Sequence, residues 1–138
     1  MLTSSIHSAL SGPRVRASLW LLLTVCAGCG PALQTANPVD PDRARETLHS
    51  ILESWQRGET PESWKQRSPE VVVQDRDWSM GATLKEFTII GRGEARDANL
   101  YCPVKLVLDE RQGGPQQRTV TYVVGTDPVL TVFRDVMQ

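Results

Sequence analysis

The chain has 138 residues, of which 40% are hydrophobic and 22% are charged, so its size suits one small globular domain. Its 15 Lys and Arg residues nearly balance its 16 Asp and Glu residues, and the formal net charge is -1. A near-neutral chain without a basic block argues against a nucleic-acid-binding protein that works by neutralising phosphates. The composition also excludes acidic-tail and low-complexity proteins.

The N-terminal segment differs in composition from the rest of the chain. It contains no acidic residue up to position 28, and Arg14 and Arg16 precede an apolar run at 17–25 that ends in small residues. This is the pattern of a secretory signal peptide. The run is too short for an ordinary transmembrane helix, which needs about 20 apolar residues. We therefore expect residues 1–28 to be a signal peptide that is removed.

The apolar run ends in Val25-Cys26-Ala27-Gly28-Cys29. This segment resembles the lipobox of bacterial lipoproteins, in which a cysteine after two small residues is acylated and becomes the mature N-terminus. The resemblance implies that Cys29 is the lipid-attachment residue. Cys26 departs from the pattern, because the family usually has Leu or another aliphatic residue there. An uncleaved anchor and an ordinary secretory signal cut near Ala27 remain as alternatives.

Lipidation would determine where the protein resides. The family resemblance implies a diacylglycerol on the thiol of Cys29 and a further acyl chain on its amine, and two or three chains hold a protein firmly on a membrane. Gly30, where an Asp would be a sorting signal, implies the outer membrane of the cell envelope, facing the periplasm. Removal of residues 1–28 takes two basic and no acidic residues, which leaves a net charge of -3. Such a domain has no electrostatic reason to lie flat on anionic lipid.

The part of the chain after Cys29 divides into a linker and a folded domain. Residues 29–39 have no charge and no periodic pattern, which indicates a flexible linker. We expect a small α+β domain over residues 40–138.

The domain begins with a strongly marked helix, expected over residues 41–57. Asp40 is placed as its N-cap, Pro41 as its first residue and Gly58 as its C-cap. The segment Thr60-Pro61-Glu62 repeats the cap signal and predicts a second short helix over 61–67. The apolar positions of the first helix form one stripe: Ala44, Leu48, Ile51, Leu52 and Trp55.

From Glu70 onward the pattern changes to the period of two that is typical of strands. The alternation slips once within 84–90, which suggests a bulge. Pro103 favours an edge position or a bulge for the strand at 100–108. Residues 79–81, 91–93, 112–116 and 126–128 are read as turns, and the expected strand segments are 71–73, 75–78, 84–90, 100–108, 119–124 and 129–134.

This order predicts an α+β fold, in which an N-terminal amphipathic helix and a short second helix pack on a curved antiparallel β-meander of about four strands. Together with the positions of Trp55, Gly58, Trp78 and Gly81, the order resembles the cystatin-like or NTF2-like class, in which a helix lies in the concave face of a bent sheet. The whole chain is also similar to short uncharacterised bacterial lipoproteins.

Few residues suggest chemistry. If Cys26 is removed and Cys29 is lipidated, Cys102 remains alone, without an internal disulfide, and its alternation with Leu100 and Val104 predicts burial. His49 flanks the apolar stripe of the first helix. No HExxH, CxxC or paired-histidine spacing occurs, so we expect no metal or cofactor.

One cluster could move a proton: Asp75 and Asp77 with Tyr101 and Tyr122. Several enzymes of the NTF2-like class use a carboxylate with a tyrosine in this way. The segment Asp75-Arg76-Asp77 is equally typical of an exposed strand end. The three tryptophans of the domain could line a ligand pocket, but the default role of large aromatic residues in a small domain is core packing: Trp55, Trp64 and Trp78.

Three functions remain open. The favoured one is a membrane-anchored envelope lipoprotein, non-catalytic, that binds an envelope protein or a small ligand and no nucleic acid. The alternative is a small NTF2-like isomerase, hydrolase or dehydratase, and the third is a structural spacer. If Asp75 and Asp77 point to solvent, the enzyme hypothesis fails. A cavity of about 300 Å³ or more, in which a carboxylate and a tyrosine converge, would favour it.

Overall fold

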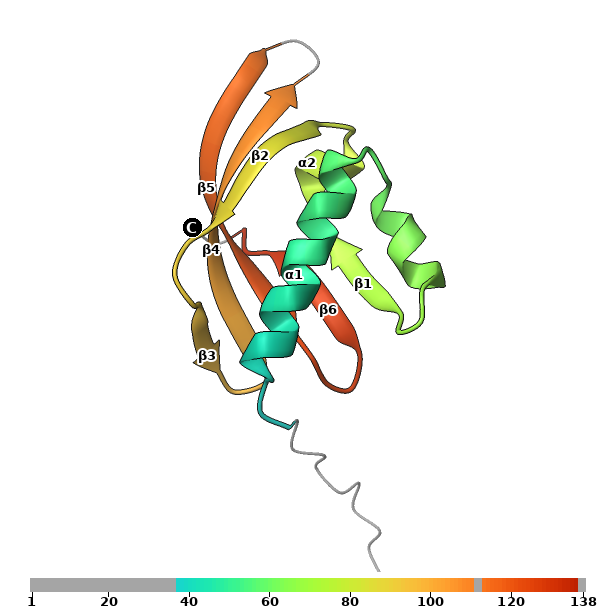
Figure 1. Ribbon diagram of the computed structural model, residues 1–138, viewed down its shortest axis with the longest axis vertical. Helices are drawn as coiled ribbons and strands as arrows, with labels where there is room; N and C mark the ends of the chain where they lie inside the picture. The colour runs from blue at the N-terminus through green and yellow to red at the C-terminus, as the bar shows by residue number, and fades with distance from the viewer. Residues whose placement is uncertain (1–36, 111–112, 137–138) are drawn as a thin grey trace, which may run out of the picture. The chain divides into compact units, whose positions relative to one another are not determined.

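The computed structural model describes residues 37–110 and 113–136 (Figure 1). The signal peptide expected over 1–28, the lipid-attachment residue Cys29 and most of the linker lie outside the described residues. The elements are α1 (Pro41–Gln56), the 3₁₀ helix η1 (Pro61–Gln66), β1 (Val71–Gln74), α2 (Arg76–Ser79), β2 (Thr83–Ile89), β3 (Glu94–Arg96), β4 (Asn99–Glu110), β5 (Gly114–Gly125) and β6 (Leu130–Arg134).

Helix α1 begins where its cap residue places it. The side chain of Asp40 accepts hydrogen bonds from the backbone N–H groups of Asp42 and Arg43, both at 3.1 Å, and Pro41 occupies the first helical position. The helix lies across the inner side of the curled sheet (Figure 1). Its buried residues face the sheet: Ala44, Leu48, Ile51, Leu52, Ser54 and Trp55.

The α+β class is confirmed, but the expected all-antiparallel meander is wrong. The sheet is curled and mixed, with the strand order β1-β6-β5-β4-β2, and β3 also pairs with β4. Strand β1 is parallel to β6, with Val71 opposite Leu130. The local pattern could not give this pairing, because β1 and β6 are separated by four other strands along the chain. The sequence period identifies a strand but not its distant partner.

The segment expected to continue as a strand after β1 is instead a short helix. In α2, the side chain of Asp75 accepts a hydrogen bond from the N–H of Trp78 at 3.0 Å and caps one helical turn. This local bond competes with strand pairing. The chain therefore changes from strand to helix after β1 and back to strand after α2.

Strand β4 shows how a proline fits inside a sheet. Strand β4 lies between β5 on one side and β2 and β3 on the other, so Pro103, opposite Thr121 of β5, is not on an edge strand. The carbonyl of Pro103 accepts from the N–H of Ile90 at 2.8 Å. On that side β4 pairs with β3 up to Tyr101 and with β2 from Val104 onward, so the proline lies between the two partners. The bulge expected in 84–90 is present in β2 between Leu84 and Glu86.

The start of the domain is fastened to two turns. The N–H of Val39 donates to the carbonyl of Asp97 at 3.1 Å, and the N–H of Asp40 donates to Oγ1 of Thr126 at 3.1 Å. The amide of Asn37 donates to Asp127 at 3.2 Å. The entering chain is thus joined to the β3–β4 and β5–β6 turns, at the opposite end of the sheet from the β4–β5 hairpin (Figure 1).

Candidate functional site

A cluster of charged and polar side chains lies inside the curve of the sheet. Asp75 comes from the cap of α2, Tyr122 from β5 and Arg134 from β6. Each strand residue points inward, because it lies two positions from a buried apolar residue on the same strand and so shares its face. Val124 follows Tyr122 by two positions, and Val132 precedes Arg134 by two. The fold therefore brings together residues up to 59 positions apart in the sequence.

Asp75 uses both carboxylate oxygens. Oδ1 accepts from the N–H of Trp78, and Oδ2 accepts from the hydroxyl of Tyr122 at 2.6 Å. The Nε of Arg134 lies 3.0 Å from the same Oδ2, as an ion-pair contact without the alignment of a hydrogen bond. The side chain of Asp75 is 1% exposed. Both carboxylate oxygens of Asp75 are thus engaged within the fold.

Asp77 extends the cluster towards the surface. Its Oδ2 pairs with Nη1 of Arg134 and lies 3.3 Å from Nη1 of Arg118. Nη2 of Arg134 is buried without a hydrogen-bond partner in the described part of the chain. The carboxylates of Asp75 and Asp77 thus balance the guanidinium groups of Arg134 and the partly exposed Arg118 in formal charge.

Burial and charge set the protonation of this cluster. Burial raises the pKa of Tyr122 well above its ordinary value, and the negative charge of Asp75 raises it further. Burial opposes the charge on Arg134, but neighbouring groups, including Asp75 and Asp77, raise the pKa of Arg134 above its ordinary value. Tyr122 therefore stays a hydrogen-bond donor and Arg134 stays a cation at neutral pH.

The expected proton-transfer cluster is thus partly assembled. Asp75 and Tyr122 meet directly, and Asp77 joins them through Arg134. Tyr101 does not join them: it faces the outer side of the sheet, where the guanidinium of Arg96 lies 4.8 Å from its ring. Its inclusion was wrong because Tyr101 and Tyr122 lie on opposite faces of paired strands; Cys102 is the residue opposite Tyr122.

A groove of about 510 Å³ lies beside the cluster, between η1, the end of β1, the start of α2 and the end of β6. Asp75 and Arg134 contribute to its wall, but Tyr122, which is 1% exposed, does not. The carboxylate and the tyrosine therefore converge on each other and not on the open space. We name this space the β1–β6 groove. Its lining residues are Glu62, Lys65, Val73, Gln74, Asp75, Arg76, Ser79, Phe133, Arg134 and Val136.

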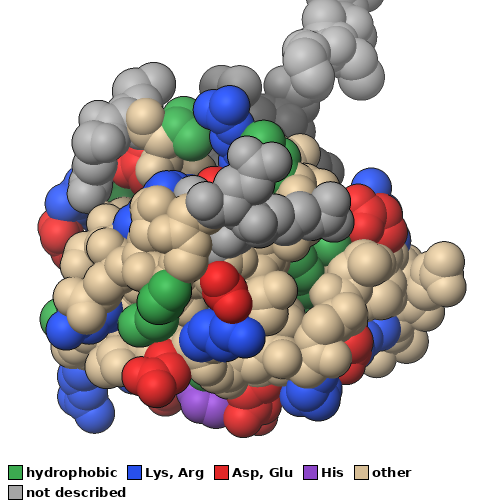
Figure 2. Space-filling view, turned by 90° about the horizontal axis from the view of Figure 1, so that it is seen from above, with side chains coloured by type: hydrophobic (Ala, Val, Ile, Leu, Met, Phe, Trp, Pro, Cys, Tyr) green, Lys and Arg blue, Asp and Glu red, His purple; other side chains and the backbone are tan. Residues whose placement is uncertain are grey.

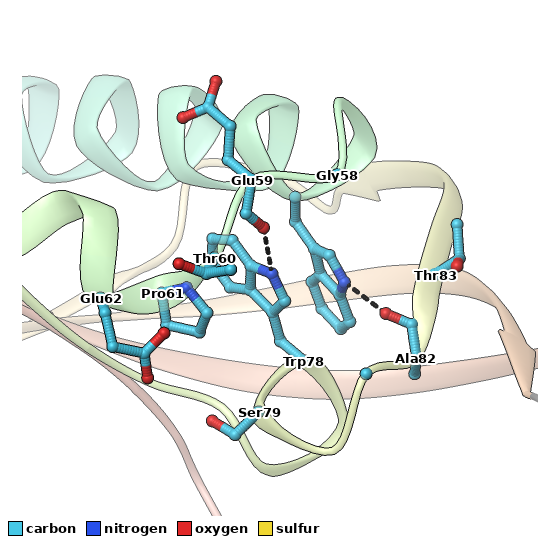
Figure 3. A pocket seen from close by; sticks show the side chains of 11 residues that line it. Gly58, Glu59, Thr60, Pro61, Glu62, Trp78, Ser79, Ala82 and Thr83 are labelled. Carbon is cyan, nitrogen blue, oxygen red and sulfur yellow. Dashed lines mark hydrogen bonds between the residues drawn. The ribbon is translucent and has the colours of Figure 1, made fainter.

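A smaller hollow of about 270 Å³ lies at the end of α1, between the segment that enters η1 and the start of β2 (Figure 3). Trp55 and Trp78 stack at its base, with ring centroids 5.3 Å apart. Their indole N–H groups donate to the backbone carbonyls of Ala82 and Glu59, at 2.7 and 2.8 Å. Both polar groups are used within the fold, so this pair is core, as expected for large aromatics.

Glu59 joins the end of α1 to η1, and no pattern in the sequence marks it for this role. Its carboxylate accepts from the hydroxyl of Ser54 at 2.8 Å and from Nε of Arg57 at 3.0 Å, and Arg67 contacts it at 2.5 Å. The hydrogen bond from Ser54, followed by that from Arg57, lowers the pKa of Glu59 below its ordinary value. Glu59 therefore holds the end of α1 and the end of η1 together.

Arg134 was also missed by the sequence analysis, although a signal for it exists. Leu130 and Val132 are buried, and the same alternation places Arg134 on the inner face of β6. A cation at an inward strand position needs a buried anion. That requirement would have linked Arg134 to one of the inward carboxylates.

The other candidate residues lie apart from this cluster. Cys102 is fully buried, as predicted, and burial raises the pKa of its thiol. His49 is exposed on α1, with its ring 5.3 Å from that of Phe87. Within residues 37–110 and 113–136, no three His, Cys, Asp or Glu side chains are grouped to hold a metal. No helix in these ranges is long and apolar enough to cross a bilayer.

The face in Figure 2 carries interspersed basic and acidic side chains in its described part, and its hydrophobic side chains occur singly. No large patch of one charge is visible among them. Comparison of the chain with protein-family models, curated proteins and solved structures gave no match. The candidate site therefore rests on its own geometry.

Proposed function

We propose that the chain is an envelope lipoprotein tethered through Cys29, whose α+β domain is a non-catalytic binding or assembly module at the periplasmic face of the outer membrane. The tether rests on the lipobox resemblance of residues 25–29. The non-catalytic role rests on one observation: both oxygens of Asp75 are bonded inside the fold, to Trp78 and Tyr122. A general base needs reach to a substrate proton, which this carboxylate lacks.

The tether is tested by metabolic labelling with palmitate. Cys29→Ala should abolish the label and leave a precursor of higher mass, because the thiol acceptor is lost. Cys102→Ala is the matched control, since its thiol is buried in the domain and the label should persist. Cys26→Ala should also keep its label. Labelling of the Cys29→Ala protein would disprove the assignment.

A small enzyme of the NTF2-like class is the second candidate. It is favoured by the contact between Asp75 and Tyr122 inside the curve of the sheet, with the β1–β6 groove beside it. For proton transfer, one of the two side chains would have to open to the groove. This candidate predicts that Tyr122 ionises near the ordinary tyrosine value in the folded protein, as measured below by titration.

A further inference from the structure

The β1–β6 groove lies at the carboxyl ends of two paired strands, β1 and β6. Strand β1 ends the strand order, and η1 and the start of α2 form the other walls of the groove. Val73 and Gln74, the last residues of β1, form part of the groove wall.

Two exposed cations, Lys65 of η1 and Arg76 of α2, lie in this groove. Neither forms an ion pair or a side-chain hydrogen bond within the described part of the chain. Asp75 is already compensated by Arg134, so Glu62 is the one exposed carboxylate in the lining. The exposed charge of the groove is therefore positive, on a chain whose formal net charge is -1.

The walls of the groove differ in character. Lys65 and Arg76 belong to the helical layer, on the inner side of the sheet, whereas Phe133 alternates with buried Val132 and faces outward. Val136, which is 82% exposed, follows on the same stretch of chain. An extended segment lying in this groove would meet the two cations on one side and Phe133 and Val136 on the other.

We propose that the β1–β6 groove binds an extended segment of a partner protein in which carboxylate and apolar side chains alternate. Its carboxylates pair with Lys65 and Arg76, and its apolar side chains pack on Phe133 and Val136. This inference deepens the proposed binding function and rests on it. Palmitate labelling is independent of the groove, so failure of one test leaves the other result intact.

The probe is a synthetic octapeptide that alternates glutamate and valine, titrated into the full-length protein in detergent and followed by fluorescence anisotropy. A peptide with glutamine in place of glutamate has the same shape without the charge. Lys65→Ala and Arg76→Ala should each weaken binding by about three-fold and together by roughly ten-fold, as expected for exposed ion pairs. Glu62→Gln should strengthen binding by about two-fold, because it removes a like charge from the groove.

The control is a double variant, Lys85→Ala with Arg92→Ala, which removes the same two kinds of cation outside the groove. It should bind the acidic peptide as the parent protein does. Circular dichroism checks that every variant is folded. Because Lys65 and Arg76 are exposed, we expect their replacement by alanine to leave the fold intact. Equal binding of the glutamine peptide, equal loss in the control variant, or no binding of the acidic peptide would each overturn the proposal. The proposal would also be overturned if decanoate, a free fatty carboxylate, competed with the peptide and its binding did not depend on Lys65 and Arg76.

Discussion

The hydroxyl of Tyr122 donates a 2.6 Å hydrogen bond to the buried carboxylate of Asp75, across 47 positions of the chain. This bond joins β5 to the cap of α2, and Arg134 adds the third member from β6. A buried carboxylate is tolerated where hydrogen bonds and an opposite charge replace water. The relationship is thus a structural joint between the sheet and the short helix.

Loss of this hydroxyl should destabilise the domain. Tyr122→Phe keeps the ring but leaves Oδ2 of Asp75 with one donor fewer, at a cost of about 1–3 kcal/mol for an under-satisfied buried group. The free energy of unfolding in urea measures it. Tyr101→Phe is the matched control, because Tyr101 lies on the outer face, and it should change stability by less than about 0.5 kcal/mol. Equal effects of the two variants would contradict a special role for the inner tyrosine.

Titration separates a structural tyrosine from a catalytic one. The chain has two tyrosines, so in the Tyr101→Phe variant absorbance at the phenolate band reports Tyr122 alone. Because burial and Asp75 raise the pKa of Tyr122, its ionisation should occur well above the ordinary value of 10.0 and coincide with alkaline unfolding. Reversible ionisation near the ordinary value in a folded protein would instead support the enzyme alternative.

The carboxylate of Glu59 should make stability depend on acid. Its pKa in the folded state is lowered from the ordinary 4.5, so its contribution is fully present above that value and is lost as the pH falls through the lower folded pKa. Glu59→Gln should therefore lower the urea midpoint near pH 7 and lose this deficit in strong acid. Glu46→Gln, on the exposed side of α1, controls for the removal of one charge. A deficit that stays constant with pH would show that the charge is not responsible.

Two glycines with the same backbone conformation should respond differently to alanine. Gly58 and Gly93 have φ of +80° and +81°, but a Cβ at Gly58 meets nothing within 4 Å, whereas at Gly93 it lies 3.0 Å from Sγ of Cys102 and from the carbonyl of Tyr101. Gly58→Ala should cost about 1–2 kcal/mol for the left-handed backbone alone. Gly93→Ala should cost about 1–3 kcal/mol more from overpacking. Thermal unfolding of the pair measures the difference, and equal costs would contradict the close approach.

The thiol of Cys102 should be inert in the folded domain. It is fully buried and its pKa is raised by burial, so both access and thiolate formation are reduced. Maleimide should label it slowly in native protein and rapidly in urea, as followed by mass spectrometry in the Cys26→Ala, Cys29→Ala background. Rapid labelling without denaturant would contradict its position in the core.

Local signals in the sequence predicted local structure well. Asp40 and Pro41 marked the start of α1, and the alternation around Cys102 identified the inner face of β4. The parallel pairing of β1 with β6 could not be predicted, because nothing in four strand residues specifies a partner on the far side of the domain. The helical turn at α2 was not predicted, because Asp75 was considered for proton transfer. In the structure Asp75 instead caps the turn that contains Trp78.

The candidate site shows the same limit. Asp75 and Tyr122 were selected for their chemistry, and their contact was found. Arg134, which neutralises the carboxylate, was assigned only as the end of the last strand. Counting inward positions along β6 would have placed it inside. Glu59 offers no such pattern, since its partners Ser54 and Arg67 meet it only once α1 and η1 have packed.

Residues 37–40 are hydrogen-bonded to the β3–β4 and β5–β6 turns, so the chain enters the domain at that end of the sheet. If Cys29 is acylated as proposed, a fully extended chain from Cys29 to Asn37 would reach at most roughly 26 Å. Asn37 would then stay within that distance of the lipid, whereas the β4–β5 hairpin lies at the opposite end of the sheet (Figure 1).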